Sequence, residues 1–541
     1  MNEENKNYST LEEEEAEAKA KSESTLFSEP QPLPGKNISK RQKETVMKRR
    51  TRTIIICAIA AAALICLYFF VVKPLVNKIA ETTKEEVTLL EGEELGPNDR
   101  ILMFPQEERS NIQSIDVHNS SGDWGFYYDA DDEQFYVTGH PEAPFDKEKI
   151  SSLFVSCGYT LSMTRVTENC EDMSEYGLSD KDNPPYYTLT TRDGNVHTVY
   201  IGNMIPTGAG YYVRYKGRDA VYVLDSTIGQ TVLQPLENMI TPMLTYPMST
   251  NDYFTVKNFA VMKDDDITVL ITYLDEEEKE AEASLGSYKM LAPANYNVND
   301  SNYSVALEKL TSFQGISTLV YDPTEDDLKE YGLLDPAYSV YYEYKGIQQT
   351  IVFSEKNENG NYYAYSLLFN LITEVDTSDG KMGWLEWDII EWVDEPIFMM
   401  NINDVQTIIV ESETATRTFD LVGEGQELVV TERETGFQPE VKNFRQFYKT
   451  LLSIYMQGYV GMTEEEIAAL DDSKDLYMTL TIETRAGVNH VYKVYPYSTR
   501  RAYYTVDGKG EFYILRDMAT KVITDAEKVM TNTVIDSEAH S

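Results

Sequence analysis

The sequence repeats itself at domain length, and this repeat constrains the fold more than any other feature. Glu175-Tyr176-Gly177-Leu178 recurs as Glu330-Tyr331-Gly332-Leu333, and a degenerate third copy ends at Ala469-Leu470. Each copy of this element is followed by a run of residues that alternates as a strand does, and then by a pair of tyrosines. The runs begin at Tyr186, Tyr338 and Leu476. The pairs are Tyr211-Tyr212, Tyr362-Tyr363 and Tyr503-Tyr504. These landmarks lie roughly 135 to 155 residues apart, which is the length of a domain rather than of a solenoid repeat. The sequence therefore predicts three tandem copies of one domain.

Each copy shows the same order of predicted elements. A meander of strands comes first, then an amphipathic helix, a short capped helix, two hairpins and a closing helix. The amphipathic helices are indicated by apolar residues at helical spacing: Ile150, Leu153, Phe154 and Cys157; Ala306, Leu310 and Phe313; Phe444, Phe447, Tyr448, Leu451 and Tyr455. Thr324 to Asp327 and Thr463 to Glu466 are capping boxes. In the first copy the closing helix is expected from about Thr227 to Leu244.

Hairpins and few helices, without alternation of strands and helices, predict an α+β fold built on antiparallel sheets. We expect three sheet-plus-helix domains, over residues 101–247, 248–397 and 398–541, on a single transmembrane helix. Gly177 and Gly332 should end their short helices in the left-handed conformation. Ala469 lacks that freedom, so the third copy should leave its helix differently.

A long apolar run from Ile54 to Val72 predicts the transmembrane helix. It carries no charge, and at ~1.5 Å per residue it spans ~28 Å, close to the ~30 Å hydrocarbon core of a bilayer. Basic residues precede it: Lys40, Arg41, Lys43, Lys48, Arg49, Arg50 and Arg52. The positive-inside rule places that side in the cytoplasm and everything after Lys73 outside. We therefore expect residues 53–72 to span the cell membrane once, with the C-terminal domains extracytoplasmic.

The apolar run does not have the features of a cleaved signal. About 50 residues precede it, the run is too long, and no small-x-small cleavage site follows. Lipidation signals need a small residue before the cysteine, but Ile56 and Ile65 precede Cys57 and Cys66. We interpret the run as an uncleaved signal anchor.

The segments on either side of the anchor differ in composition. Residues 1–52 contain an acidic run and alternating prolines that cannot bury apolar area, so we expect a disordered cytoplasmic tail with a basic juxtamembrane segment. Residues 73–100 are rich in helix formers from Asn77 to Leu95 and end at Gly96-Pro97. This pattern predicts a stalk in which a helix continues out of the membrane.

The charge excludes one class of partner. The net charge is −43, whereas residues 1–52 hold eleven basic and ten acidic residues, so the acidic excess lies beyond the tail. Nucleic-acid sites need clustered Lys and Arg, so no nucleic-acid binding is expected. A solvated surface is the plain interpretation, and a weak divalent-cation or basic-partner surface is the alternative.

No motif identifies a catalytic, cofactor or metal site. The five histidines share no zinc-like spacing with one another or with the cysteines; they are His118, His140, His197, His490 and His540. Asp129, Asp131, Asp132 and Glu133 lack the spaced ligands of a calcium loop, so we interpret them as a solvated hairpin turn. Cys157 and Cys170 are too few for a disulfide framework, and Cys157 can equally be a buried free thiol. No cofactor is expected.

Aromatic residues are the more informative excess. Many of the 39 tyrosines fall on predicted strands as adjacent pairs, so one ring of each such pair must face away from the core. Ordinary strand packing explains this pattern, and a face that stacks sugars or peptides is the alternative. Trp384 and Trp387 would share one face of a helix, which we place at the seam between the second and third copies.

The stretch from Tyr186 to Leu244 resembles the bacterial envelope family called domain of unknown function 4340. The resemblance is carried by the Tyr-Gly-Leu element, YTLTTRDGNVHTVYIGN, GAGYYVRYKGRDAVYVLD and a helix that ends near a proline. It is close in the first copy, partial in the second and weak in the third. The resemblance implies a single-pass, outward-facing protein, often encoded beside ABC exporter components of the gliding-motility auxiliary type, and it supplies no catalytic residues.

We therefore expect a membrane-anchored extracytoplasmic accessory or binding protein rather than an enzyme. An ABC-type export complex is the partner that the resemblance implies. The alternative is a cell-envelope-modifying enzyme whose acidic residues form a site that cannot be identified in sequence. A broad aromatic face would favour binding, whereas a deep cleft with clustered carboxylates would favour the enzyme.

Overall fold

The structure is a computed structural model that describes residues 68, 73 and 87–536. The predicted tail, most of the anchor from Ile54 to Val72 and the start of the stalk lie outside these residues. No helix within the described part of the chain is long and apolar enough to cross a membrane. The chain from Leu89 onward forms one compact unit.

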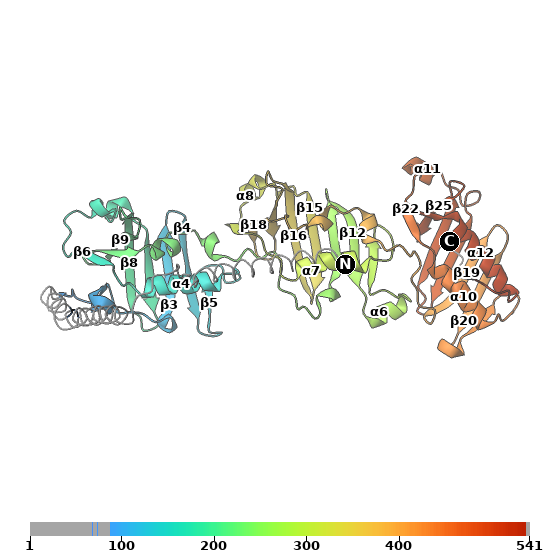
Figure 1. Cartoon of the computed structure of the whole chain (residues 1–541), viewed down its shortest axis with the longest axis horizontal. Helices are drawn as coiled ribbons and strands as arrows, with labels where there is room; N and C mark the ends of the chain where they lie inside the picture. The colour runs from blue at the N-terminus through green and yellow to red at the C-terminus, as the bar shows by residue number, and fades with distance from the viewer. Residues whose placement is uncertain (1–67, 69–72, 74–86, 537–541) are drawn as a thin grey trace, which may run out of the picture. The chain divides into compact units, whose positions relative to one another are not determined.

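Three eight-stranded antiparallel sheets follow one another along this unit, and all three have the same strand order (Figure 1). The first sheet consists of β5 (Gln134–Val137), β4 (Gly122–Asp129), β3 (Ile112–Asn119), β7 (Tyr186–Thr191), β8 (Val196–Met204), β9 (Gly210–Tyr215), β10 (Val221–Asp225) and β6 (Thr164–Thr167). The second consists of β13 (Tyr288–Ala292), β12 (Asp266–Tyr273), β11 (Lys257–Lys263), β15 (Tyr338–Tyr344), β16 (Ile347–Lys356), β17 (Tyr362–Ser366), β18 (Leu371–Val375) and β14 (Thr318–Tyr321). The third consists of β21 (Val429–Glu432), β20 (Thr416–Val422), β19 (Val405–Ser412), β23 (Met478–Thr484), β24 (Asn489–Pro496), β25 (Arg501–Val506), β26 (Phe512–Leu515) and β22 (Met456–Tyr459).

The shared order follows from one chain path. Three meander strands form one side of the sheet, and a helix then carries the chain to a single strand at the opposite edge. The chain returns to the centre, where four hairpin-linked strands begin and run outward to that edge strand. The first strand of the meander therefore pairs with the first strand of the hairpins, as β3 does with β7. The prediction of three tandem α+β units on antiparallel sheets is confirmed.

The crossing helices are α4 (Lys147–Gly158), α7 (Asp300–Leu310) and α10 (Val441–Leu452). Figure 1 shows α4 lying across the first sheet, where its apolar stripe is buried as predicted. The buried residues of the three helices align at the same spacing: Ile150, Leu153, Phe154, Cys157; Tyr303, Ala306, Leu307, Leu310; Phe444, Phe447, Tyr448, Leu451. Two predicted members lie beyond the helix ends: Phe313 is still buried, whereas Tyr455 is exposed.

The short capped helices are η4 (Met173–Tyr176), α8 (Glu325–Glu330) and α11 (Glu464–Ala468). The capping boxes at Thr324 and Thr463 are both present. Gly177 and Gly332 have φ of 68° and 69°, so both adopt the left-handed conformation as predicted. Ala469 has φ of −84°, and the third copy leaves its helix by a right-handed route.

The closing segments differ between the copies, and the long helix predicted from Thr227 to Leu244 is wrong. The first copy has α5 (Thr227–Thr231) and the 3₁₀ helix η6 (Leu236–Met239). Pro235 between them lacks the backbone donor that a continuous helix needs. The second copy has η8 (Gly383–Glu386) and α9 (Ile389–Trp392), and only the third closes with a long helix, α12 (Arg516–Met530).

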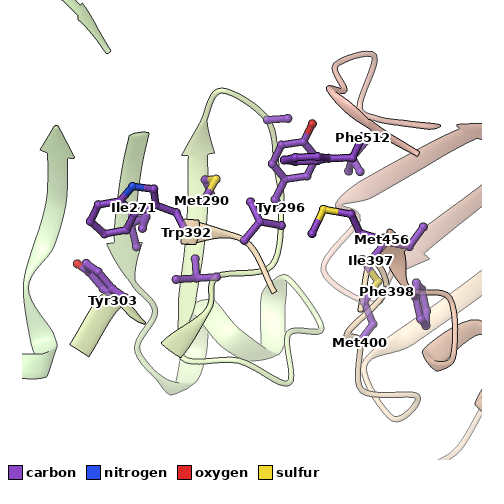
Figure 2. Packing of buried hydrophobic residues seen from close by; sticks show 14 of the residues in the cluster. Ile271, Met290, Tyr296, Tyr303, Trp392, Ile397, Phe398, Met400, Met456 and Phe512 are labelled. Carbon is purple, nitrogen blue, oxygen red and sulfur yellow. The ribbon is translucent and has the colours of Figure 1, made fainter. Parts of the chain in front are cut away.

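The tryptophans do not share one face of a helix, so that part of the prediction is wrong. The segment divides into η8 and α9, and Trp387 between them has an extended backbone with φ of −66° and ψ of 135°. The segment does lie beside the third copy, since the Ile390 N–H donates a hydrogen bond to the Tyr459 hydroxyl of β22 at 3.3 Å. Trp384 and Trp392 are buried, with ring centroids 6.1 Å and 5.8 Å from that of Phe259 on β11. The buried cluster that contains them also includes the inward residues of the third sheet, and Figure 2 shows Tyr296 next to Phe512, at 5.1 Å between centroids.

The described end of the stalk is not helical, contrary to the prediction. It forms β1 (Glu94–Leu95), which pairs with β2 (Ile101–Leu102), with η2 (Pro97–Asp99) between them. The buried carboxylate of Glu93 accepts hydrogen bonds from Tyr222 at 2.6 Å and Arg165 at 2.6 Å. These tertiary contacts outweigh the helix propensity of an acidic segment. The remaining elements are α6 (Glu276–Ala281) and the 3₁₀ turns η3 (Arg109–Asn111), η5 (Asp180–Asp182), η7 (Tyr253–Thr255) and η9 (Gly425–Glu427).

Candidate functional site

The first sheet has one face covered by helices and one open face. Ile115 on β3 and Tyr187 on β7 point toward α4 and belong to the core of this copy. Because successive side chains in a strand point to opposite faces, His118, Tyr186 and their neighbours project from the other face. The predicted division of a tyrosine pair is confirmed here, since Tyr187 is fully buried and Tyr186 is half-exposed.

Four side chains form a continuous row across this open face. We call His118, Tyr186, Tyr200 and Arg214 the aromatic row. Each residue is paired directly opposite the next across β3, β7, β8 and β9. The ring centroids of His118 and Tyr186 are 5.0 Å apart, and those of Tyr186 and Tyr200 are 5.4 Å apart. The Cζ atom of Arg214 lies 4.3 Å from the Tyr200 ring centroid. Cross-strand contacts of these kinds stabilise a sheet and fix the rings in place.

Carboxylates surround the row. Asp123 contacts the His118 imidazole at one end, and Asp180 contacts the Arg214 guanidinium at the other. Asp116 on β3 lies over Gly125, where an added Cβ would come within 2.9 Å of its Oδ1 atom. Partial burial raises the pKa of the Asp116 carboxyl, although a hydrogen bond from Ser114 opposes this. The row is therefore an aromatic and cationic strip with an acidic rim.

The aromatic row occurs in the first copy alone. The strand registers align it with two other sets: Met262, Ser339, Val352 and Tyr365 in the second copy, and Glu411, Thr479, Lys493 and Thr505 in the third. Neither set reproduces the succession of three rings followed by a guanidinium group. The three sheets share a fold, but only the first presents this surface.

The registers also correct the predicted alignment of the tyrosine pairs. Tyr211 and Tyr362 occupy corresponding positions, as predicted, but the residue at that position in the third copy is Ala502. Tyr503 instead corresponds to Tyr212 and Tyr363. The pairs therefore match in the first two copies and are offset by one residue in the third, because identity along a strand does not specify its register.

His197 lies inside a packed network rather than at an accessible site. Its Nδ1 is 3.1 Å from the Tyr215 hydroxyl, and its Nε2 is 3.2 Å from a carboxylate oxygen of Glu107. The Phe104 ring stacks on the imidazole with 4.1 Å between centroids. Burial lowers the pKa of His197 and outweighs the opposing effect of Glu107. This carboxylate, imidazole and phenol chain holds the segment that leads into β3.

The register places His197, Gln349 and His490 at corresponding positions, and all three are buried. The Gln349 side chain accepts a hydrogen bond from the Tyr246 N–H at 2.6 Å, and His490 Nδ1 lies 3.1 Å from the amide nitrogen of Asn295. A buried polar residue at this position therefore binds a segment from outside the strands of its own sheet in each copy. His140 packs edge-on against Tyr321, and His540 lies outside the described residues.

The other candidate residues have structural roles. Asp129 to Glu133 form the hairpin turn between β4 and β5, where Asp129 accepts a hydrogen bond from the Asp131 N–H at 2.9 Å. No group of three or more histidine, cysteine or acidic side chains within residues 87–536 is arranged to hold a metal ion. Cys157 and Cys170 are both free thiols, and burial raises the pKa of Cys157 well above its ordinary value.

The aromatic row was not identified from the sequence. The sequence shows that each of these residues occupies an outward position on its strand. It does not show the order of the strands in the sheet, so it does not show that the residues are neighbours. The pairing of β3 with β7 brings His118 beside Tyr186 across more than 60 residues of chain, including a helix.

The comparisons with known proteins identify a family. The profile described as "Domain of unknown function (DUF4340)" matches residues 136–314 and 288–473, which together cover more than half of the chain. Both matches begin at the third meander strand, in β5 or at the start of β13, and continue into the next copy. No curated protein and no solved structure gives a significant match. The chain therefore belongs to the DUF4340 family, of which it carries two matching copies.

Proposed function

We propose that this chain is an extracytoplasmic binding protein, held at the cell membrane by the run from Ile54 to Val72. The anchor is supported by the length and uncharged character of that run and by the basic residues before it. The partner we propose is a protein of an ABC-type export complex, for which the chain would be an accessory component. This part rests on the resemblance drawn from the sequence.

The aromatic row is the observation that carries the binding function. Tyrosine and arginine are enriched at protein interfaces, because they combine apolar area with hydrogen-bonding groups. Tyr186 and Tyr200 are held rigidly by their neighbours in the row, so binding a partner would order few additional side chains. The acidic rim of Asp116, Asp123 and Asp180 favours a partner whose surface is basic around the contact.

Site-specific cross-linking in intact membranes tests this proposal. The photoreactive residue p-benzoylphenylalanine replaces Tyr200 in one variant and Lys493, the corresponding residue of the third sheet, in a matched control. We expect irradiation to give a discrete adduct with a membrane-associated protein from position 200 and none from position 493. No adduct at position 200, or the same adduct from both positions, would contradict a binding face on the first sheet.

The proposed topology has its own test. A cysteine introduced near Ser541 in intact cells should react with a membrane-impermeant thiol reagent, whereas one introduced near Asn2 should be protected. The opposite pattern would place the sheets in the cytoplasm and exclude an extracytoplasmic function.

A further inference from the structure

The helical side of the first copy contains a groove between α4 and the closing segment of α5 and η6. The closing segments of the three copies meet the crossing helix in different ways. In the third copy the chain runs from Arg516 to Asn532, whose side chain accepts a hydrogen bond from the Glu440 N–H at 2.8 Å at the start of α10. In the first copy the shorter stretch from Thr227 to Met239 covers the equivalent path, and the Met239 carbonyl accepts from the Asp146 N–H at 2.8 Å.

The flank of the crossing helix is covered in the second and third copies. Asp525 of α12 is fully buried and accepts a hydrogen bond from Thr450 of α10 at 2.9 Å. In the second copy, the Glu391 carbonyl accepts from the Asn302 amide of α7 at 2.7 Å, and Trp392 packs nearby. Beside α4 the closing chain is divided at Pro235 into α5 and η6, and the groove lies between these two segments and the helix.

The resulting groove has a volume of about 470 Å³. Its lining is rich in hydroxyl and amide groups: Lys149, Ser152, Thr227, Gln230, Thr231, Gln234, Asn238 and Met239. Lys149 is the single charged side chain among these described residues, although the protein as a whole is strongly acidic. This volume lies within the range of small-molecule sites.

Hydrogen bonds hold the walls of the groove in place. Lys149 Nζ donates to the Asn238 carbonyl at 2.7 Å, and the Asn238 amide donates to Gln234 Oε1 at 2.7 Å. Gln234 in turn donates to the Gly229 carbonyl at 3.2 Å. The groove is therefore formed before any ligand arrives, and the buried Met239 side chain lies beneath its lining.

We propose that this groove binds a neutral, hydroxyl-rich ligand of the size of one or two sugar units. Amides and hydroxyls both donate and accept hydrogen bonds, as sugar hydroxyls do, so the two sets of groups are complementary. The lining contains no carboxylate to attract a cation, and the charge of its one ammonium group is offset by Asp146, whose Oδ2 atom lies 3.9 Å from Lys149 Nζ. This site lies on the opposite side of the sheet from the aromatic row and does not depend on the function proposed for that row.

Ligand-observed NMR on the full-length protein in a sugar-free zwitterionic detergent tests the proposal. The probes are N-acetylglucosamine, its β-1,4-linked dimer and the charged comparator glucuronate. We expect saturation transfer to the neutral probes, with affinity for glucuronate at least fivefold weaker. Gln230→Ala should weaken neutral-sugar binding about fivefold, the loss expected for one hydrogen bond. Ser152→Trp should abolish binding by filling the groove.

Val305→Trp is the matched control, because Val305 on α7 corresponds to Ser152 on α4. It should leave binding unchanged, and thermal unfolding should show that both tryptophan variants remain folded. If Ser152→Trp does not fold, the exposed Gln230→Ala substitution decides the question. The proposal is overturned if neither neutral probe binds, if glucuronate binds as tightly as they do, or if Gln230→Ala has no effect.

Discussion

The ring of Tyr176 packs edge-on against the ring of Tyr212, with 4.9 Å between the two centroids. Tyr331 and Tyr363 repeat this contact in the second copy at 5.0 Å. The tyrosine of the Tyr-Gly-Leu element therefore holds the short helix against the hairpin strands. In the third copy Ala468 occupies the tyrosine position, and the contact is absent among the described residues.

Gly202→Ala should displace the Tyr-Gly-Leu element of the first copy. A Cβ atom on Gly202 would collide with the Tyr176 carbonyl oxygen and come within 2.8 Å of the Leu178 side chain. We expect a loss of about 2–3 kcal/mol in the free energy of unfolding, as for other overpacked sites. Denaturant unfolding measures it, with Gly461→Ala as the control because open space surrounds that residue. A stability equal to that of the control would contradict the close approach.

Gly332→Ala should destabilise the protein more than Ala469→Gly. The backbone at Gly332 has the left-handed conformation, and an added Cβ would lie 3.6 Å from its nearest neighbour, an atom of Ser354. The expected loss of ~1–2 kcal/mol in the free energy of unfolding therefore comes from the backbone conformation alone. Ala469 is right-handed, so a glycine there loses only chain entropy, less than ~1 kcal/mol. Thermal unfolding of the two variants compares them. Equal shifts would show that the two helix ends do not differ as described.

His197→Gln should reduce the acid sensitivity of the protein. The folded pKa of His197 is below its ordinary value of 6.5, so the unfolded chain binds a proton more readily. The stability contributed by the neutral imidazole is therefore fully present above about pH 6.5 and is lost as the pH falls through the folded pKa. Glutamine, the residue at the corresponding position 349, does not titrate.

Urea unfolding at pH 7.5 and 5.5 measures this effect. The wild-type midpoint should fall further between the two pH values than the midpoint of His197→Gln. Comparison of the two proteins at pH 7.5 gives the effect of the substitution itself on stability. An identical pH dependence in the two proteins would show that His197 does not contribute to it.

Cys157 should resist alkylation in the folded protein, whereas Cys170 should react. Cys157 is buried on α4, and its raised pKa keeps it in the unreactive thiol form. Cys170 is partly exposed. Iodoacetamide treatment followed by peptide mass spectrometry, with and without denaturant, compares the two sites. Modification of both residues at similar rates without denaturant would contradict the burial of Cys157.

Local chemistry made much of the fold predictable. The buried stripe of α4 follows from apolar residues at helical spacing, and the caps at Thr324 and Thr463 follow from a hydroxyl placed three residues before a carboxylate. The left-handed glycines follow from the steric cost of a Cβ in that conformation. The tandem α+β organisation could be predicted because the same local signals recur three times.

Predictions failed where distant contacts outweighed local propensity. The stalk has the composition of a helix up to Leu95, yet burial of the Glu93 carboxylate against Arg165 and Tyr222 selects an extended form. The closing segments differ in length and meet different helix flanks, so each copy closes in its own way. The sequence contains no signal for these partners, because they lie far away along the chain.

The sequence by itself determined the repeat, the class of each domain and which residues of a strand share a face. Tertiary structure alone decided which strands lie side by side, and therefore whether His118, Tyr186, Tyr200 and Arg214 meet in one row. It also decided that the closing segment, divided at Pro235, leaves a groove beside α4. The physical reason is that periodicity within a strand fixes the direction of a side chain, whereas its neighbours depend on packing of the whole chain.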